Sequence, residues 1–459
     1  MKKTAAQIPE GVKRIHFIGI GGSGMFPIVQ ILHAQGYEIT GSDNNPSDIV
    51  DMERAMGIPV VMGQKAENIA GADMIVHTAA IMADNPELIA AKASGLPVWE
   101  RSKILGAVSA CYDQCICVAG THGKTTTTAL LTQVLLGAGL DPTAVIGGKL
   151  PAIGGYGRCG STEIMTCEAC EFSNTFLELH PATALILNVD NDHLEFFGSM
   201  ENLIAAFRKF AALATRHIVV NGDDPDSLKA VEGLTNAPIT TFGLTDKNDY
   251  YAANIVMHTG VRCSFDLMHR GEKLCAMNLQ IPGRHNICNA VAAAAAALLA
   301  GAKPEEIARE AVKFGGAGRR FEVYGEFGGV TVADDYAHHP TEIGATLSAA
   351  KEMGFGQVWA VFQPFTYSRT AMLLEDFAKV LAIADRVVMS EIMGSREKNT
   401  YNIYTADLAA KIPGSVWYPG FEEMADYVAA HAKPGDLVIT LGCGDVYKCA
   451  RMIRDRLQE

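Results

Sequence analysis

The residues with the clearest chemistry are GTHGKTTTT at positions 120–128. An apolar run, CICVA, precedes them and a helical pattern, ALLTQVLLGAG, follows, so the segment predicts a strand, a tight loop and a helix. Glycines let backbone N–H groups converge on a polyphosphate, an exposed Lys124 adds a positive charge near the terminal phosphates, and the Thr125 hydroxyl suits Mg²⁺. The common P-loop spacing requires glycine where this chain has Val118, so we predict a shorter nucleotide-binding loop.

A second glycine loop, GIGGSG, follows the strand-like run RIHFI near the N-terminus. Gly19, Gly21 and Gly24 match the pattern G-x-G-x-x-G, and Asp43 lies about twenty residues further on. The pattern indicates a diphosphate above a helix N-terminus, with Asp43 accepting a hydrogen bond from a ribose hydroxyl. It does not identify the nucleotide, so a nicotinamide-dependent (NAD(P)) oxidoreductase is one interpretation of this segment.

Acidic and histidine side chains follow two later strand-like runs. EIMTCE leads to Glu168 and Glu171, and ATALILNV leads into DNDH, which contains His193. Ligands collect beyond the carboxyl ends of strands in α/β sheets, so we expect Thr125, Glu168 and His193 to meet at one metal–nucleotide site. A solvated carboxylate and a hydrogen-bonded structural histidine are the alternatives for Glu168 and His193.

Further polar residues occur at a helix start and at strand ends. His285 and Asn289 are four residues apart on one face of an alanine-rich helix, a spacing that suits contacts with a base or a ribose and equally suits the polar start of a buried helix. In the last third of the chain, polar groups follow the strand-like runs VTVADDYA, QVWAVFQP, RVVMSEI and DLVITLGCGD and indicate another substrate site. These groups are Asp334, Asp335, Tyr336, His338, His339, Arg369, Gly442, Gly444 and Asp445.

Strands and helices alternate along the whole chain, which predicts an α/β protein, and 459 residues suggest about three domains. Residues 1–110 predict a Rossmann-like domain. Residues 111–317 predict a central P-loop domain with a mixed sheet, because residues 250–281 alternate weakly, as antiparallel strands do. Residues 318–459 predict a second Rossmann-like domain.

Composition excludes several classes of partner. The formal net charge of −13 argues against nonspecific binding of nucleic acid or of an anionic membrane. The longest apolar run, AVAAAAAALLA, is about half of a membrane span, and the N-terminus lacks the apolar segment of a secretory signal. We therefore expect a cytoplasmic protein whose 11 cysteines are reduced packing residues rather than metal ligands.

Together these motifs resemble the Mur ligase family. HFIGIGGSGM, HTAAI, AGTHGKTTTT, EACEFSNTFL, NVDNDHL, PGRHN, GRRFE, DDYAHHPTE, FQPFTYSRT and LGCGDVYK follow the family's order over almost the whole chain. The short P-loop is the form that these ligases use. The resemblance implies an ATP- and Mg²⁺-dependent enzyme that attaches L-alanine to UDP-N-acetylmuramate through an acyl phosphate, in peptidoglycan precursor synthesis. It also implies that the first glycine loop holds the UDP of the sugar substrate.

The resemblance further implies a role for individual residues. Lys124, Glu168 and His193 are the implied catalytic residues, and Thr125, Glu168 and His193 the implied metal ligands. The implied ATP-binding residues are Gly120, Thr121, His122, Gly123, Lys124, Thr125, Thr126, His285, Asn289, Arg320 and Asp335. The implied UDP-sugar-binding residues are Gly21, Gly22, Ser23, Gly24, Ser42, Asp43, Thr78 and His122. The implied amino-acid-binding residues are Tyr336, His338 and Arg369.

The chain departs from the family pattern at two positions. Cys170 stands where an acidic residue is usual and Phe365 where a histidine is common, so we carry no role onto either. Sister ligases use a carbamylated lysine, for which Lys209 is only a nearby candidate. The alternatives are a family member that adds another amino acid or a recycled murein peptide, and a non-catalytic nucleotide-binding partner of the true ligase. The expected partners are small-molecule substrates, and the expected assembly is a monomer or a homodimer.

Overall fold

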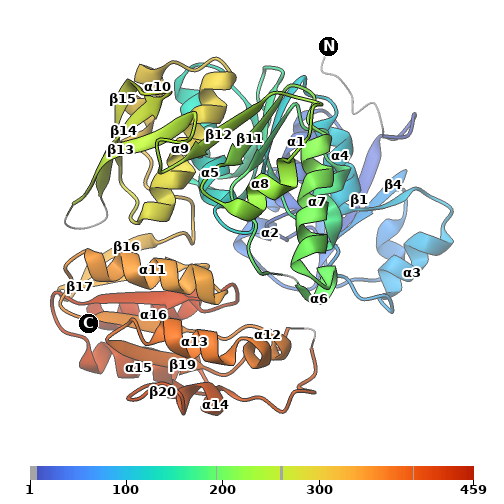
Figure 1. The fold of residues 1–459 in the computed structure, drawn as a ribbon. Helices are drawn as coiled ribbons and strands as arrows, with labels where there is room; N and C mark the ends of the chain where they lie inside the picture. The colour runs from blue at the N-terminus through green and yellow to red at the C-terminus, as the bar shows by residue number, and fades with distance from the viewer. Residues whose placement is uncertain (1–7, 193, 259–261, 396, 459) are drawn as a thin grey trace. The chain divides into compact units, whose positions relative to one another are not determined.

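The computed structural model describes residues 8–192, 194–258, 262–395 and 397–458. These residues form three β-sheets with helices packed on them (Figure 1). By internal contacts the chain divides into two compact units. The first comprises the residues up to Ala252 together with Leu267–Cys275 and Asn289–Glu310, and the second comprises Ala253–Asp266, Ala276–Cys288 and the residues from Ala311 on.

The first sheet has five strands in the order β3-β2-β1-β4-β5, and all neighbouring strands in it are parallel. Its strands are β1 (Arg14–Ile18), β2 (Glu38–Asp43), β3 (Val60–Met62), β4 (Met74–His77) and β5 (Val98–Glu100). The chain turns to one side of β1 and then to the other. The glycine loop after β1 therefore lies at the topological switch point, where such sheets bind ligands.

The second sheet has ten strands in the order β15-β14-β13-β12-β11-β10-β6-β9-β7-β8. They are β6 (Gln114–Ala119), β7 (Thr143–Leu150), β8 (Gly155–Arg158), β9 (Ile164–Ala169), β10 (Thr183–Ile186), β11 (His217–Asn221), β12 (Ile239–Gly243), β13 (Tyr250–Met257), β14 (Cys263–His269) and β15 (Glu272–Leu279). Strands β7 and β8 pair antiparallel, and β14 and β15 are joined by two residues, which only an antiparallel pair allows. The sheet is mixed, as predicted.

The third sheet has the order β16-β17-β21-β18-β19-β20, with β16 antiparallel to β17 and the other pairs parallel. Its strands are β16 (Glu322–Phe327), β17 (Val330–Asp335), β18 (Val358–Phe362), β19 (Arg386–Ser390), β20 (Val416–Tyr418) and β21 (Leu437–Leu441). Successive residues of β18 enter opposite cores, Ala360 on one face and Trp359 and Val361 on the other. Because both faces are buried, the strand sequences are continuously apolar.

Helices cover these sheets (Figure 1). With the first two sheets are α1 (Phe26–Ala34), α2 (Asp48–Ala55), α3 (Pro86–Ala93), α4 (Arg101–Ser109), α5 (Lys124–Gly137), α6 (Leu194–Phe197), α7 (Met200–Ala212), α8 (Pro225–Val231), α9 (Arg284–Leu299) and α10 (Pro304–Ala311). With the third sheet are α11 (Pro340–Glu352), α12 (Tyr367–Met372), α13 (Leu374–Leu381), α14 (Thr405–Ala409), α15 (Phe421–His431) and α16 (Tyr447–Gln458). The short 3₁₀ helices are η1 (Ala66–Ile69), η2 (Pro151–Ile153) and η3 (Phe172–Glu178).

Two glycines allow close contact between the segments that carry the first and second sheets, all within the first unit. A side chain at Gly106 in α4 would overlap the backbone carbonyl of Glu178. A Cβ at Gly157 in β8 would lie 2.6 Å from the Cβ of Pro27 in α1. The ring of Phe26 also packs edge-on against Tyr156, with centroids 6.1 Å apart. The two segments therefore touch backbone against backbone.

The predicted α/β fold is confirmed. Strands β16 and β20 were not predicted from the sequence. Within the described residues, no helix is both long and apolar enough to cross a membrane. All 11 cysteines are free thiols, and Cys115, Cys117 and Cys167 are buried where β6 pairs with β9.

Candidate active site

The predicted phosphate loop joins β6 to α5, and glycine conformations shape it. Gly120 and Gly123 have φ values of +145° and +87°, which disfavour any side chain. A Cβ at Gly120 would lie 2.8 Å from the Cβ of Leu187, and a Cβ at Gly123 would overlap the side-chain amide of Asn289 in α9. The structure thus brings Asn289, predicted from its helix position, directly against the loop.

Hydrogen bonds fix the loop to the segment that follows β10. The N–H of Thr121 donates to the backbone carbonyl of Asn188 at 3.1 Å, and the N–H of His122 donates to the Asn188 side chain at 2.8 Å. The N–H of Asp190 donates to the Thr121 hydroxyl at 2.9 Å, and the His122 ring lies 3.1 Å from the Asp190 carboxylate. These bonds hold the shape of the loop, and Asn188 and Asp190 are supporting residues that were not predicted from the sequence.

Lys124 is the first residue of α5 and does not extend into solvent. Its Nζ lies 2.9 Å from the Glu171 carboxylate and also donates to the backbone carbonyls of Thr121, at 3.0 Å, and Gly120. The side chains of Lys124 and Glu171 are 16% and 3% exposed. Burial is the largest single effect on the pKa of Lys124 and acts to lower it, but the charge and hydrogen bond of Glu171, together with the charges of Cys170 and Glu168, raise the pKa overall. The expectation of an exposed loop lysine is wrong, because Glu171 holds it.

Two of the predicted metal ligands, Glu168 and Thr125, belong to segments next to each other in the second sheet. Glu168 is in β9, and Thr125 is in the helix that follows β6, the neighbour of β9. Glu168 is near the end of β9, where its carboxylate accepts a hydrogen bond from the N–H of Gly147 at 2.6 Å. A Cβ at Gly147 would lie 2.7 Å from that carboxylate, so the glycine leaves room for it. Thr125 is buried in the first turn of α5, next to Thr126, which is also buried.

Predicted ligand His193 lies outside the described residues. Within the described part of the chain, no three His, Cys, Asp or Glu side chains form a ready-made metal cluster. The hydroxyl of Thr125 and the carboxylate of Glu168 are hard oxygen donors of the kind that Mg²⁺ prefers. These two residues fit a magnesium ion bound jointly with nucleotide phosphates.

The first glycine loop is held by Asp43. One carboxylate oxygen of Asp43 accepts from the N–H of Gly21 at 3.0 Å, and the other accepts from the N–H of Asn45 at 3.0 Å. The N–H of Gly19 donates to the carbonyl of Ser42 at 2.8 Å. In this structure Asp43 therefore fixes the loop, in addition to its predicted role near a ribose.

The Ser42 side chain is fully buried and lies behind the loop. Its hydroxyl donates to the Glu87 carboxylate at 2.7 Å, and the same carboxylate lies 2.6 Å from the ring of His16. The other ring nitrogen of His16 is 2.8 Å from the Thr40 hydroxyl. This buried network supports the loop through the backbone of Ser42. A lone histidine in the apolar run RIHFI was the sequence signal for it.

Two side chains lie against the glycine loop: Thr78, which was predicted as a site residue, and Arg101, which was not. A Cβ at Gly19 would lie 2.6 Å from the methyl group of Thr78, so Thr78 contacts the loop. A Cβ at Gly24 would lie 3.3 Å from a guanidinium nitrogen of Arg101, the first residue of α4. Ser23 is exposed and Gly22 is partly exposed. Arg101 was not predicted.

In the second unit, the ring of Tyr336 has two guanidinium groups beside it, those of Arg319 and Arg320, each 5.0 Å from its centroid. Arg319 also donates to the Asp334 carboxylate at 2.8 Å and to the backbone carbonyls of Gly442 and Gly444 at 2.6 and 3.0 Å. Its planar guanidinium group can make these bonds together because it carries several N–H donors. Arg319 thereby ties the ends of β17 and β21 together. Arg319 was not predicted as a site residue, whereas its neighbour Arg320 was.

Asp335 is a buried support for the same strand ends. Its carboxylate accepts from the N–H of Ala337 at 2.7 Å and the N–H of Phe321 at 2.9 Å. Burial raises the pKa of Asp335 to about 6, although the nearby charge of Arg320 opposes the rise. In the described structure this carboxyl group organises backbone, and its predicted position near ATP remains a prediction.

Two residues predicted to bind the amino-acid substrate, His338 and Arg369, lie close to helix starts. The ring of His338 is 3.2 Å from the Glu342 carboxylate, which also accepts from the N–H of His338 at 3.1 Å. Arg369 is in the first turn of α12, where its N–H donates to the Thr366 hydroxyl at 3.4 Å. Thr366 has a φ of +61°, a strained value for a threonine. Predicted His285 is an exposed residue of α9 whose ring lies against Gly283.

The structure also shows where Cys170 and Phe365, the two departures from the family pattern, and the candidate Lys209 lie. Cys170 directly follows β9 and precedes Glu171, and burial raises the pKa of its thiol. Phe365 is partly buried and forms an isolated parallel bridge with Met393. Lys209 is exposed in the last turn of α7.

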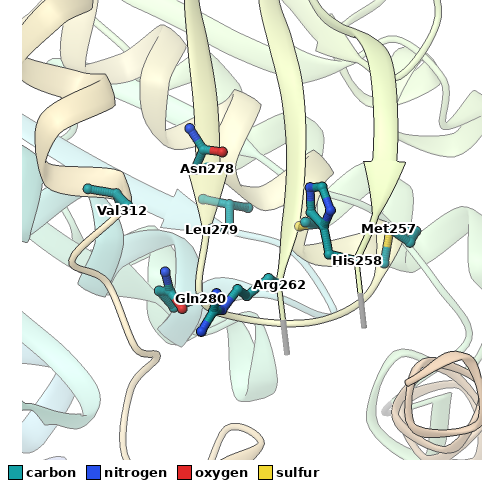
Figure 2. A pocket seen from close by; sticks show the side chains of 8 residues that line it. Met257, His258, Arg262, Asn278, Leu279, Gln280 and Val312 are labelled. Atoms are coloured by element: carbon teal, nitrogen blue, oxygen red, sulfur yellow. The ribbon is translucent and has the colours of Figure 1, made fainter. Parts of the chain in front are cut away.

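The second unit also contains a cavity of about 550 Å³ (Figure 2). It is lined by Met257, His258, Arg262, Cys263, Asn278, Leu279, Gln280 and Val312. His258 and Arg262 are exposed side chains, and the His258 ring bonds the Ser264 hydroxyl at 2.8 Å. No predicted site residue lines this cavity.

Comparison with known families gives three matches along the chain. A family model described as the Mur ligase middle domain matches residues 118–297. Models described as the Mur ligase family catalytic domain and as the Mur ligase glutamate ligase domain match residues 14–112 and 319–444. The first glycine loop, the P-loop and the strand-end residues of the third sheet all lie within these matches.

Individual proteins are similar over nearly the whole chain. The UDP-N-acetylmuramate--L-alanine ligase of Agathobacter rectalis is 44% identical over 94% of this chain and 95% of its own length. The protein of the same name from Acetivibrio thermocellus is 40% identical over 98% of both chains. Among solved structures, UDP-N-acetylmuramate-alanine ligase MurC from Thermotoga maritima matches with a TM-score of 0.82 and 27% identity, over 97% of this chain and 99% of that one. A murein peptide ligase from Psychrobacter arcticus, 23% identical, shares the fold with a TM-score of 0.76 over 98% and 99% of the two chains.

Proposed function

Because the chain belongs to the Mur ligase family, as its sequence motifs indicated, we propose that it uses ATP to join L-alanine to UDP-N-acetylmuramate, in peptidoglycan precursor synthesis in the cytoplasm. The observation that carries the proposal is the identity of 40–44% with relatives that bear that ligase name, over at least 94% of the chain. The phosphate loop at residues 120–126, fixed in shape and backed by Asn289, supports it.

The proposed reaction follows from the chemistry of a carboxylate, whose oxygen is a poor leaving group. An oxygen of the lactyl carboxylate attacks the γ-phosphorus of ATP, the bond to the β-phosphate oxygen breaks, and ADP leaves. The amine of L-alanine then attacks the acyl phosphate carbonyl, and inorganic phosphate leaves as the amide forms and a proton is released. No covalent enzyme intermediate is needed, so catalysis consists of positioning and of neutralising charge.

Lys124 supplies positive charge in this proposal. Two anions, the carboxylate and the γ-phosphate, must approach each other, and a cation beside them lowers their repulsion. Glu171 holds Lys124 at 2.9 Å in the described structure, so the side chain must exchange that partner for phosphate oxygens. A Mg²⁺ ion held by Thr125 and Glu168, with His193 near a second one, would supply further charge neutralisation when bound.

The remaining sites are assigned by element. The loop of Gly21, Gly22, Ser23 and Gly24, with Thr78 against it, is proposed to hold the UDP part of the sugar substrate. Asn289 and His285 on α9 are proposed to contact the adenosine of ATP, with Arg320 and Asp335 near the transferred phosphoryl group. Tyr336, His338 and Arg369 are proposed to contact the amino acid.

Two alternatives compete with this proposal. A same-family ligase that adds a recycled murein peptide has the same chemistry, and the murein peptide ligase from Psychrobacter arcticus, at 23% identity, shares the fold. A nicotinamide oxidoreductase was suggested by Gly19, Gly21, Gly24 and Asp43, which all lie within the Mur ligase match to residues 14–112. The relatives at 40–44% identity favour L-alanine over a peptide.

Phosphate release with each substrate omitted in turn tests the proposal. We expect release only when ATP, UDP-N-acetylmuramate and L-alanine are all present with Mg²⁺. Release with a tripeptide but not with L-alanine would indicate the recycling reaction instead. Saturable binding of NADH, followed by absorbance, would support the oxidoreductase. Tight ATP binding without ADP formation, whatever amine is supplied, would indicate a non-catalytic partner.

A further inference from the structure

The glycine loop after β1 presents a run of backbone donors. The N–H groups of Gly22, Ser23 and Gly24 have no hydrogen-bond partner among the residues that the structure describes. The N–H of Gly21, by contrast, is already bound by Asp43. Successive N–H groups of this kind form a concave surface of partial positive charge that suits an anion. This loop alone does not say which side chain completes the site.

Arg101 lies against the same loop. Its Nη1, Cζ and Cδ atoms would lie 3.3, 3.6 and 3.6 Å from a Cβ at Gly24. The side chain is only partly exposed, yet its guanidinium makes no ion pair or hydrogen bond with any described residue. The adjacent carboxylate, Glu100, instead accepts from the N–H of Ser102 at 3.2 Å. A partly desolvated cation without a counter-ion is unfavourable, so the position favours an anionic partner.

The helix that carries Arg101 also packs against the segment that follows Glu171, the partner of the P-loop lysine. A side chain at Gly106 of α4 would overlap the carbonyl of Glu178 at the end of η3, which begins directly after Glu171. Lys124 is already paired with Glu171. Arg101 therefore contacts one glycine loop, and it opens a helix that packs against the segment next to the partner of the P-loop lysine.

We propose that Arg101 binds the diphosphate of the sugar nucleotide, together with the N–H groups of Gly22, Ser23 and Gly24. The guanidinium presents several donors in a planar fork, which matches two oxygens of a phosphate better than an ammonium group does. Its place at the start of α4, which leads into β6 and the P-loop, also lets it hold the substrate beside the ATP site. The inference rests on the proposed function and adds a binding residue to it.

Calorimetric titration of UDP into wild-type protein and into R101M tests the inference. We expect R101M to bind UDP at least tenfold more weakly, because a charge-assisted hydrogen bond is lost. The affinity for ADP should stay within about twofold of wild type, because the P-loop is unchanged. The logarithm of UDP affinity should also depend less steeply on salt concentration in R101M, since one cation is removed.

K103M is the matched control, because Lys103 is an exposed residue of the same helix, and its ammonium lies 4.5 Å from the Trp99 ring centroid. It removes the same charge from α4 and should leave UDP affinity within about twofold of wild type. Equal losses in R101M and K103M, or unchanged UDP affinity in R101M, would overturn the inference. If R101M melts far below wild type, R101Q is titrated in its place, and the same two outcomes decide.

The proposed function has a separate readout. Phosphate release by the wild-type enzyme that depends on L-alanine supports the ligase whatever R101M does. A wild-type enzyme that is active, with R101M binding UDP normally, would refute the role of Arg101 alone. An inactive wild-type enzyme that still binds UDP through Arg101 would refute the ligase alone.

Discussion

Lys124 and Glu171 show how one residue pair links stability and chemistry. Both side chains are largely buried, and the ammonium group has the Glu171 carboxylate at 2.9 Å and two backbone carbonyls as partners. Removing one member of a buried pair leaves the other without compensation. The lysine that the proposed reaction needs is therefore also part of the structure of the loop.

We expect Lys124→Ala to lower alanine-dependent phosphate release by about a hundredfold or more, since the proposed charge on the phosphates is lost. We also expect a loss of about 1–3 kcal/mol of stability, because Glu171 stays buried and unpaired. Denaturant unfolding and phosphate release measure the two effects.

The double variant K124A/E171Q separates them. Without a buried charge on either side, it should recover most of the lost stability while activity stays low. A K124A enzyme with near-normal turnover would contradict the assignment of the lysine.

Glu53 gives a prediction about pH. It is fully buried in α2, and neither carboxyl oxygen has a hydrogen-bond partner among the described residues. Burial and then the nearby negative charge of Asp43 raise the pKa of Glu53 from 4.5 to about 8. Between these values the unfolded chain has released the proton and the folded chain retains it. This group's contribution to stability must therefore fall as pH rises from about 4.5 to about 8.

We expect this fall to be about 3 kcal/mol between pH 5 and pH 8, and to be absent in Glu53→Gln. The measurement is denaturant unfolding of both proteins at several pH values. Glu67→Gln, at an exposed glutamate, should follow the wild-type pH dependence. Parallel curves for wild type and Glu53→Gln would show that Glu53 ionises normally.

At the scale of residues, a contact can be predicted from the sequence when a ligand requires a particular type of residue at a particular spacing along the chain. Asn289 was predicted from helical spacing and lies against the loop at Gly123. The His16–Glu87 pair and the bonds of Arg319 to Gly442 and Gly444 join residues 71 and more than 120 positions apart. The lone histidine in RIHFI marks one member of the first pair, but no local pattern reveals which residues are the partners. The roles of the predicted ligand-binding residues remain predictions.

At the scale of elements, the two ends of α5 offer a controlled comparison. Gly123 precedes the helix with φ +87°, and Gly139 follows it with φ +75°. A Cβ at Gly123 would overlap Asn289, whereas a Cβ at Gly139 would meet nothing within 4 Å. Backbone strain is thus similar at both positions, and only Gly123 adds a steric clash inside the candidate ATP site.

We expect Gly139→Ala to cost about 1 kcal/mol of stability and to leave ADP affinity unchanged. Gly123→Ala should cost more stability and weaken ADP binding at least tenfold, because the loop must move away from Asn289. Calorimetric titration of ADP into both variants makes the comparison. Equal ADP affinities would show that the contact with Asn289 does not shape the site.

Strands with two buried faces were the elements most easily predicted. β18 and β21 are wholly buried, so their sequences are unbroken apolar runs. β16 and β20 were missed because their residues are partly exposed and mixed in polarity, with a register shift in β16. In η3, Ser173 and Asn174 have φ values of 54° and 59°, a conformation that local sequence does not favour.

At the scale of the molecule, both glycine loops belong to the first unit and lie after the first strand of their respective sheets. Each is bound mainly by its own neighbours, Asp43 in one case and Asn188 with Asp190 in the other. Ligands at the two loops should therefore protect different backbone segments.

Hydrogen exchange with mass spectrometry tests this expectation. UDP should slow exchange at residues 19–25 and 42–45, and ADP should slow it at residues 120–126 and 188–190, by a factor that rises with occupancy. Protection of the P-loop by UDP with no change at residues 19–25 would contradict the assignment of the first loop.

The close contacts at Gly106 and Gly157 have a consequence for genetic variation. Every single-base change that alters a glycine codon's amino acid adds at least one carbon or introduces a stop, and at Gly106 that carbon falls on the Glu178 carbonyl. In a saturation mutagenesis screen for growth, we expect these two codons to tolerate as little change as those of the phosphate loop. The contact between the two segments would then tolerate substitution as poorly as a catalytic residue does, although neither glycine is proposed to touch a substrate.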